Sequence, residues 1–209
     1  MVDASEASVP TAQVAGHHAV VTRYSTGVVV LHWLIALMIL SNIALAWSAE
    51  YLSRAEAGKV MAVHMSTGIL VLLLSLLRLG WRLLHPIPPY PAGLPQWEKT
   101  SARLVHWGFY VIMIGMPLTG WIMTSGPRAK AAITIYGLVH WPYLPFVHHA
   151  QGEAAKLWHT IGETHGVLAY LAYALIVLHV GAALKHQFID RDVIMARMAP
   201  IFGGRRTAE

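Results

Sequence analysis

Four stretches of this sequence are apolar for roughly 20 residues each, and this limits the possible folds more than any other feature. A helix rises about 1.5 Å per residue, so about 20 residues cross the ~30 Å hydrocarbon core of a bilayer. With 56% hydrophobic and 12% charged residues, the composition also indicates a membrane protein. We therefore expect an all-α membrane protein, a four-transmembrane-helix antiparallel bundle. The four predicted spans are Gly27–Trp47, Val60–Leu79, Leu104–Ser125 and His165–Leu184.

The positive charges are distributed unevenly over the two sides of such a bundle. With four spans both termini lie on one side, and the positive-inside rule assigns the side richer in Lys and Arg to the cytoplasm. We therefore expect both termini to be cytoplasmic. The side of the termini carries Arg23, Arg78, Arg82, Lys99, Arg103, Lys185, Arg191, Arg197, Arg205 and Arg206, and the other side carries Arg54, Lys59, Arg128, Lys130 and Lys156.

The chain divides into a bundle and two tails. Residues 1–22 lack the basic segment and apolar run of a removable signal peptide, so we expect a flexible N-terminal tail. Residues 23–187 form the bundle, and 188–209 mix cations with apolar residues as a cytoplasmic or interfacial tail does. The proline-rich stretch from Pro86 to Pro95 predicts a non-helical loop between the second and third spans.

The chain contains 13 histidines and no cysteine. The absence of cysteine excludes disulfides, Cys-bound iron–sulfur clusters, thiolate zinc sites and thioether-attached haem. Metal or redox chemistry would therefore depend on imidazole, carboxylate or a non-covalent cofactor. Because ionisable residues inside a span are costly, histidines within the spans are the first candidates for function.

Four histidines fall at two matching depths of the predicted bundle. His165 and His179 are 14 residues apart, only about 40° short of four full turns, so they share one helix face about 21 Å apart. Because consecutive spans run in opposite directions, His32 lies level with His179, and His64 lies level with His165. Two stacked bis-imidazole sites in a four-helix bundle are what two b-type haems require.

The residues one turn beyond these histidines are small, which leaves room for a macrocycle. They are Ala36, Gly68, Ala169 and Ala183. One turn beyond His106 lies the bulky Tyr110 instead. This favours a role for His106 as a buried hydrogen-bonding or quinone-pocket residue, although His106 stays open as a ligand. His159 lies on the face opposite to His179, and we interpret it as a loop or helix-start residue.

Several groups of residues together are typical of one known family. They are Arg23-Tyr24-Ser25 with Leu31-His32-Trp33, His64-Met65-Ser66-Thr67-Gly68 with Trp81-Arg82, Ala102-Arg103-Leu104-Val105-His106-Trp107 with Pro117-Leu118-Thr119-Gly120-Trp121, and Leu178-His179 with Ala182-Ala183-Leu184-Lys185-His186. From about Tyr24 to Phe188, the chain resembles the bacterial cytochrome b561 family. The resemblance implies two haem b groups, axial ligands at His32, His64, His165 and His179, and a place in the bacterial inner membrane.

The outer ligand on the fourth span departs from the family pattern. In the family this histidine is commonly followed by Glu, whereas His165 is followed by Gly166. The nearby Trp158-His159 imitates the motif, so His159 remains the alternative if the fourth helix begins earlier than predicted.

The resemblance implies electron transfer by a superoxide:ubiquinone oxidoreductase. Superoxide, as a small anion, would be drawn to Arg128, Lys130 and Lys156 on the outer side, unless these are interfacial residues or partners of the haem propionates. Ubiquinone would accept electrons near the inner haem, with hydrogen bonds or protons from His186, Lys185, His106 and Arg103.

Other functions remain open at this point. A second hypothesis is a membrane-anchor cytochrome b, which passes electrons between a hydrogenase-type or formate-dehydrogenase-type partner and quinone. A haem-free, histidine-lined metal transporter or structural bundle explains neither the level pairing nor the small residues. We expect contacts with membrane lipid and none with nucleic acid, and the sequence leaves a homodimer and a partner subunit equally open.

Overall fold

The computed structural model describes residues 24–85, 87–91, 93–126, 133–148 and 153–199, and of residues 153–159 only the backbone. Its long helices are α1 (Thr26–Ala49), α2 (Arg54–Leu84), α3 (Gln96–Thr124) and α5 (Glu153–Leu184). Each contributes a segment that is long and apolar enough to cross a membrane. The prediction of a four-helix, multi-pass membrane protein is therefore confirmed, and the helices extend beyond the apolar spans at several ends.

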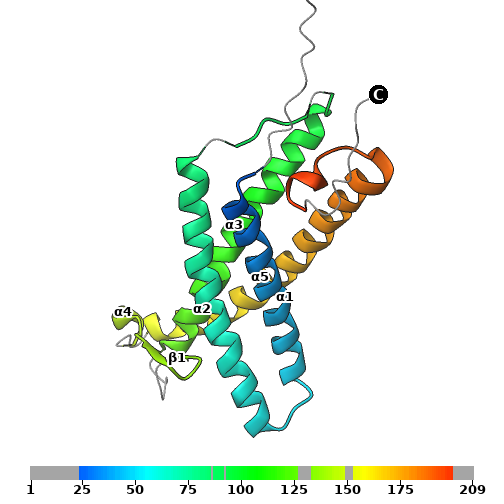
Figure 1. The fold of residues 1–209 in the computed structure, drawn as a ribbon. Coiled ribbons are helices and arrows are strands. Elements are labelled where there is room, and N and C mark those ends of the chain that lie inside the picture. Colours follow the sequence, from blue (N-terminus) through cyan, green and yellow to red (C-terminus); the bar gives the residue numbers. More distant parts are fainter. Residues whose placement is uncertain (1–23, 86, 92, 127–132, 149–152, 200–209) are drawn as a thin grey trace, which may run out of the picture.

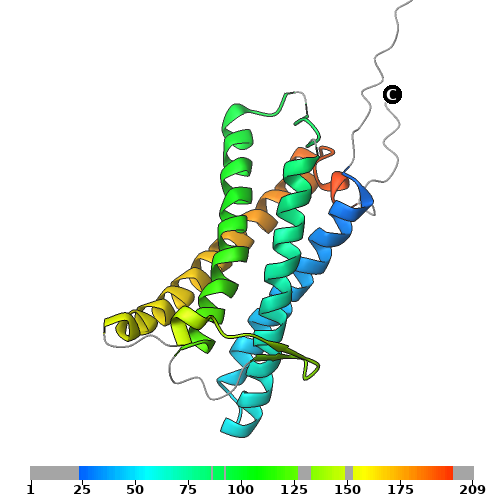
Figure 2. The same ribbon diagram turned by 90° about the vertical axis from the view of Figure 1, so that its left-hand side faces the viewer.

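The long helices pack in chain order, with α1 against α2, α2 against α3, and α3 against α5. Figures 1 and 2 show the start of α1, the end of α2, the start of α3 and the end of α5 at one end of the molecule. We call this the proline end, after the loop of residues 85–95. The opposite end holds the turn between α1 and α2 and a small hairpin, and we call it the hairpin end.

Local sequence signals explain where α2 and α3 begin and end. Ser53 and Glu56 form a capping box at the start of α2, in which the backbone N–H of Glu56 donates to Ser53 Oγ and the N–H of Ser53 donates to Glu56 Oε2 at 3.1 Å. At the other end, His85 is extended. Helix α3 starts directly after Pro95. The proline-rich stretch is thus non-helical where it is described, as predicted.

The third connection contains a hairpin that helical periodicity did not predict. Strands β1 (Ile133–Ile135) and β2 (Val139–Trp141) are antiparallel, and a short helix, α4 (Pro145–His148), follows them. The turn places Tyr136 and Gly137 at positive φ, which is unusual for a tyrosine. Three contacts hold the hairpin on α2: the Tyr136 N–H donates to Ser66 Oγ at 3.1 Å, Ser66 Oγ lies 3.4 Å from the Thr134 carbonyl oxygen, and the Thr67 and Tyr136 hydroxyls are 2.9 Å apart.

The chain folds back onto the proline end after α5. A π-helix, η1 (Lys185–Asp190), continues α5, and a 3₁₀ turn, η2 (Met195–Arg197), follows. The Trp33 indole N–H donates to the Met198 carbonyl at 2.8 Å, and Arg197 Nη1 donates to the Pro89 carbonyl at 2.6 Å. The predicted C-terminal tail is therefore in contact with the bundle as far as the described residues extend.

Most of the apolar surface of the helices faces outward. A small core forms around Ile35, Tyr110 and Met113. By contrast, large apolar side chains such as Leu37, Val111 and Val177 are 60% to 71% exposed. Outward apolar surface of this extent is what a bundle presents to lipid tails, which are themselves apolar.

Candidate functional site

Three histidines from three helices meet at the proline end. The ring of His179 on α5 lies 6.1 Å, centroid to centroid, from that of His32 on α1 and 5.8 Å from that of His106 on α3. Two imidazoles on opposite sides of one metal ion, with bonds of about 2 Å each, have ring centres roughly 6 Å apart. The predicted level pairing of His32 with His179 is therefore present in the structure, and His106 stands equally close.

The other two histidines are oriented by backbone carbonyls. His64 Nδ1 lies 3.1 Å from the Asn42 carbonyl oxygen, and His165 Nδ1 lies 3.1 Å from the Met116 carbonyl oxygen. A carbonyl only accepts, so each Nδ1 carries the proton and each Nε2 keeps a free lone pair. The same arrangement is usual in metal-binding histidines. The two rings also interact electrostatically with one another, as residues at one depth of the bundle do.

Helix α3 shapes the surroundings of His165 although it carries neither member of that pair. A Cβ added at Gly120 would lie 3.4 Å from His165 Cε1. The Thr119 hydroxyl donates to the Met116 carbonyl at 2.7 Å and accepts from His165 Nδ1 at 2.9 Å. Sequence reasoning missed these supporting residues, and the only signal was their place in the motif from Pro117 to Trp121.

The four histidines fit a bis-imidazole iron group. His64 and His165 have their Nε2 atoms available, and the buried Nδ1 of His32 has no hydrogen-bond partner among the described residues. Gly68, one turn beyond His64, has only the Asn42 side chain near the place of a Cβ, at 3.9 Å. Neutral nitrogen donors without thiolates are the ligand set of a b-type haem.

Two arginines of α2 lie beside the histidines of the proline end. Arg78 interacts electrostatically with His32 and His179. The Arg82 guanidinium lies 5.7 Å from the ring centre of Trp107 and 5.6 Å from that of Tyr110. In the part of the chain that the structure describes, neither arginine forms an ion pair with a carboxylate.

Tyr24, just before α1, belongs to the same end of the molecule. Burial raises the pKa of the Tyr24 hydroxyl, and the nearby charges of Arg82 and Arg197 partly offset this effect. The arginines of α2 and Tyr24, just before α1, thus lie at the same end of the molecule as the three histidines.

The residues predicted to surround a quinone do not form one contact group. Lys185 contacts Glu98 and Asp190, and His186 contacts Asp190 and Asp192. Arg103 is exposed and donates to Thr100 Oγ1 at 3.4 Å, which is a contact within α3. His106 lies with His179, as described above.

Several predicted residues lie outside what the structure describes. Arg128 and Lys130 are not among the described residues, and the side chains of Lys156 and His159 are not described. Helix α5 nevertheless begins at Glu153, so the backbone of His159 is inside the helix rather than in a loop. Helix α5 thus begins earlier than the predicted fourth span, which is the condition under which His159 stays open as the outer ligand, and the contacts with α3 favour His165.

Comparison with known proteins finds one family over nearly the whole chain. A family model described as prokaryotic cytochrome b561 matches residues 23–200. A probable superoxide oxidase CybB of Yersinia pestis is 29% identical over 182 residues, which cover 85% of this chain and 96% of that protein. Cytochrome b561 homolog 2 of Escherichia coli K12 is 29% identical over 84% of this chain and 90% of its own, and homolog 1 is 28% identical over 85% and 97%.

Proposed function

The chain belongs to the prokaryotic cytochrome b561 family, a family of membrane electron-transfer proteins that implies haem b, and from this premise we propose that it oxidises superoxide and reduces ubiquinone. One observation carries the proposal: the rings of His32 and His179 lie 6.1 Å apart at the proline end. His64 and His165, which interact electrostatically, would form a second pair at the hairpin end. Two pairs at different depths suit a path for electrons through the bilayer.

We assign one haem b to each pair. His32 and His179 would hold the first group, and His64 and His165 the second, with the Asn42 and Met116 carbonyls fixing the last two rings. Haem b held by two imidazoles supplies one-electron transfer, because its iron keeps no open position for a substrate. Arg78 and Arg82 would pair with the carboxylates of the group at the proline end, since they lie beside its histidines.

The donor side follows from charge and from one relative. The positive-inside rule places the proline end in the cytoplasm and the hairpin end in the periplasm of a bacterial inner membrane. The Yersinia pestis relative is named as a probable superoxide oxidase. Three cations follow α3 in the sequence and would attract a small anion. Arg128 and Lys130 come between α3 and β1, and Lys156 is in the first turn of α5.

The acceptor side requires protons as well as electrons. Two superoxide ions lose one electron each and leave as two O2 molecules, and one ubiquinone takes up the two electrons together with two protons to become ubiquinol. The net demand for protons arises only at the quinone. His106, Arg103, Lys185 and His186 are the polar side chains of the proline end that we place around it.

The decisive test is rapid mixing of the purified protein with superoxide. We expect the α-band absorbance of reduced b-type haem to rise on mixing, and a water-soluble ubiquinone analogue to be reduced faster than without the protein. Superoxide dismutase added beforehand should abolish both signals.

If the haem stays oxidised while dithionite still reduces it, superoxide is not the donor. A hydrogenase-type or formate-dehydrogenase-type partner subunit, found by co-purification from the native membrane, would then replace the proposed donor. Absence of any reducible α band would instead remove haem itself from the proposal.

A further inference from the structure

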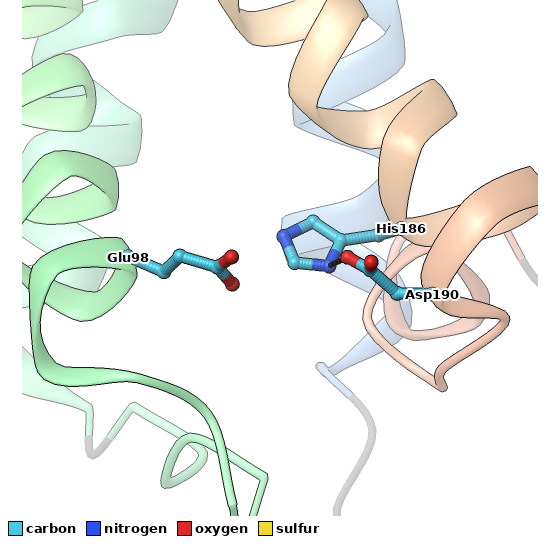
Figure 3. A group of neighbouring side chains, drawn as sticks. All are labelled: Glu98, His186 and Asp190. Carbon is cyan, nitrogen blue, oxygen red and sulfur yellow. Dashed lines mark ion pairs between the residues drawn. The ribbon is translucent and has the colours of Figure 1, made fainter.

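We propose that Glu98, Lys185, His186, Asp190 and Asp192 form a proton relay that carries cytoplasmic protons to the quinone. This relay deepens the proposed function and rests on it. Figure 3 shows three of the five side chains, with Glu98 approaching from α3 and with His186 and Asp190 on the continuation of α5.

The five side chains are joined by an unbroken series of short contacts. Lys185 Nζ lies 3.0 Å from Glu98 Oε1 and 2.6 Å from Asp190 Oδ2. His186 Nδ1 lies 3.1 Å from Asp190 Oδ2 and 2.7 Å from Asp192 Oδ2. One ligand atom of Glu98, of His186 and of Asp190 all lie within 4.8 Å of one another. Glu98 and His186 share no direct bond among these contacts, and a single water would connect them across that spacing.

The irregular end of α5 creates this group. In an α-helix, residues five apart point about 140° away from each other, so Lys185 and Asp190 would not meet. The wider turn of the π-helix η1 brings them to one side. Arg191 then adopts a left-handed conformation with φ of 51°, and the Asp192 N–H donates to the His186 carbonyl at 3.1 Å. This sharp turn returns the Asp192 side chain to His186, and such π-helical turns and strained residues occur often at functional sites.

The exposure of the side chains gives the relay a direction. Asp190 and Asp192 are 29% and 25% exposed, whereas His186 and Glu98 are only 13% and 12% exposed. Protons would therefore enter at the two aspartates and move inward to the imidazole and to Glu98. Lys185, at 40% exposure, contacts Glu98 and Asp190 at once and limits the repulsion between these two carboxylates.

An imidazole is suited to the central position because its two nitrogens are on opposite sides of the ring. His186 Nδ1 faces the aspartates, and the opposite edge of the ring is directed toward Glu98 in Figure 3. The ring accepts a proton at one nitrogen and releases one from the other, which is the usual role of a histidine shuttle. Three carboxylates against one ammonium also leave an excess of negative charge around the ring, which attracts protons from the cytoplasm.

The relay performs no redox step of its own. Each proton that leaves Glu98 for the quinone is replaced through His186 from the aspartates and the cytoplasm, so two passages supply the two protons of one ubiquinol. The electrons arrive separately from the donor. A relay of this kind limits only the quinone-dependent half of the reaction.

Glu98→Gln tests the relay in the full-length, haem-loaded protein, with Glu50→Gln at the opposite end as the matched control. Superoxide should reduce the haem of both variants at the wild-type rate. Quinone-dependent reoxidation of Glu98→Gln should slow by roughly 10- to 100-fold, at or below the lower limit of general acid–base effects. The slowing should grow with rising pH, because fewer bulk protons reach the quinone directly, and the solvent deuterium isotope effect should change. Glu50→Gln should behave as wild type.

Asp190→Asn and chemical rescue separate a relay from a structural link between α3 and η1. Added imidazole should restore reoxidation in His186→Gly, and added weak acid should restore it in Asp190→Asn. The relay is wrong if the variants reoxidise at the wild-type rate with the wild-type isotope effect. It is also wrong if they lose haem or thermal stability and no rescue occurs, since the group is then only a structural link. If the wild-type protein reduces no quinone, the proposed function fails first and the relay fails with it.

Discussion

Gly120 on α3 faces the imidazole of His165 on α5 so closely that a Cβ at residue 120 would lie 3.4 Å from Cε1 and 3.8 Å from Nδ1 of the histidine. Thr119, the residue before it, contacts the same ring through a 2.9 Å bond between its Oγ1 and Nδ1. Helix α3 therefore decides which way the His165 ring turns, although it supplies no ligand to that pair.

Gly120→Leu should remove the haem of the hairpin end and leave the other in place. The added side chain would collide with the ring and turn Nε2 away from the metal, and interiors tolerate such overpacking poorly. We expect the haem-to-protein ratio, measured as pyridine haemochrome, to fall by about half. Gly166→Leu is the matched control, because Gly166 adjoins His165 and a Cβ there meets nothing within 4 Å. Full haem content in Gly120→Leu would show that His165 is not held from α3.

His32 and His106 stand at similar distances from His179, and substitution can tell them apart. His32→Leu should remove the haem of the proline end, because Ala36 leaves room one turn beyond and the Nδ1 of His32 is buried without a described partner. His106→Leu should keep both haems and slow quinone reduction, because the bulky, buried Tyr110 lies one turn beyond His106. The opposite pattern of haem loss would exchange the two assignments.

Electron paramagnetic resonance of the oxidised protein gives the readout. Bis-imidazole iron has a low-spin signal, so a variant that loses the haem of the proline end loses one of the two low-spin signals. The remaining signal then identifies which pair is intact. His179→Leu serves as the reference, since it removes the histidine that both candidates face.

The arrangement of the long helices could be predicted from the sequence because it depends on the helical repeat and on the length of the apolar segments. Histidines 14 residues apart must share a helix face, and antiparallel spans must bring His32 to the level of His179. Both consequences need only the geometry of a regular helix. The contact between these two rings at 6.1 Å is the part of this reasoning that the structure confirms.

The parts that sequence reasoning missed depend on irregular backbone. The hairpin turn at Tyr136 uses a positive φ that the residue type does not favour. The π-helix at Lys185–Asp190 changes which residues share a face, so the partners of Lys185 and His186 could not be deduced from a 3.6-residue period. The contact that orients His64 is made by the backbone carbonyl of Asn42, and any residue type at position 42 would supply the same carbonyl.

Replacement of Arg128, Lys130 and Lys156 together by Gln should slow the reduction of haem by superoxide about tenfold at low ionic strength. The difference should disappear as salt screens the charges over a Debye length of about 10 Å at 0.1 M. Stopped-flow absorbance at several salt concentrations measures this. Arg54→Gln with Lys59→Gln is the control, because these cations lie in the first two turns of α2 and should matter less. Loss of haem in the triple variant, with no change in salt dependence, would make these residues partners of the cofactor instead.

The hydrogen bond between Trp33 and Met198 should hold the C-terminal segment against the proline end. Trp33→Phe keeps an aromatic ring but removes the 2.8 Å bond to the Met198 carbonyl, which is worth about 1 kcal/mol. A loss of that size increases the population of the released segment roughly fivefold. Cleavage by trypsin after Arg197, which is otherwise held by its 2.6 Å bond to the Pro89 carbonyl, should accelerate to the same degree.

Trp47→Phe provides the control for this experiment, because Trp47 lies at the other end of α1 and contacts the Tyr173 ring at 5.6 Å. Mass spectrometry of the released peptide in lipid nanodiscs reports the cleavage rate for each variant. Equal rates in Trp33→Phe and wild type would mean that Arg197 alone retains the segment. In that case trypsin should release the segment of Arg197→Gln faster than that of the wild type, by cleavage after Arg191, whereas Trp33→Phe shows no acceleration.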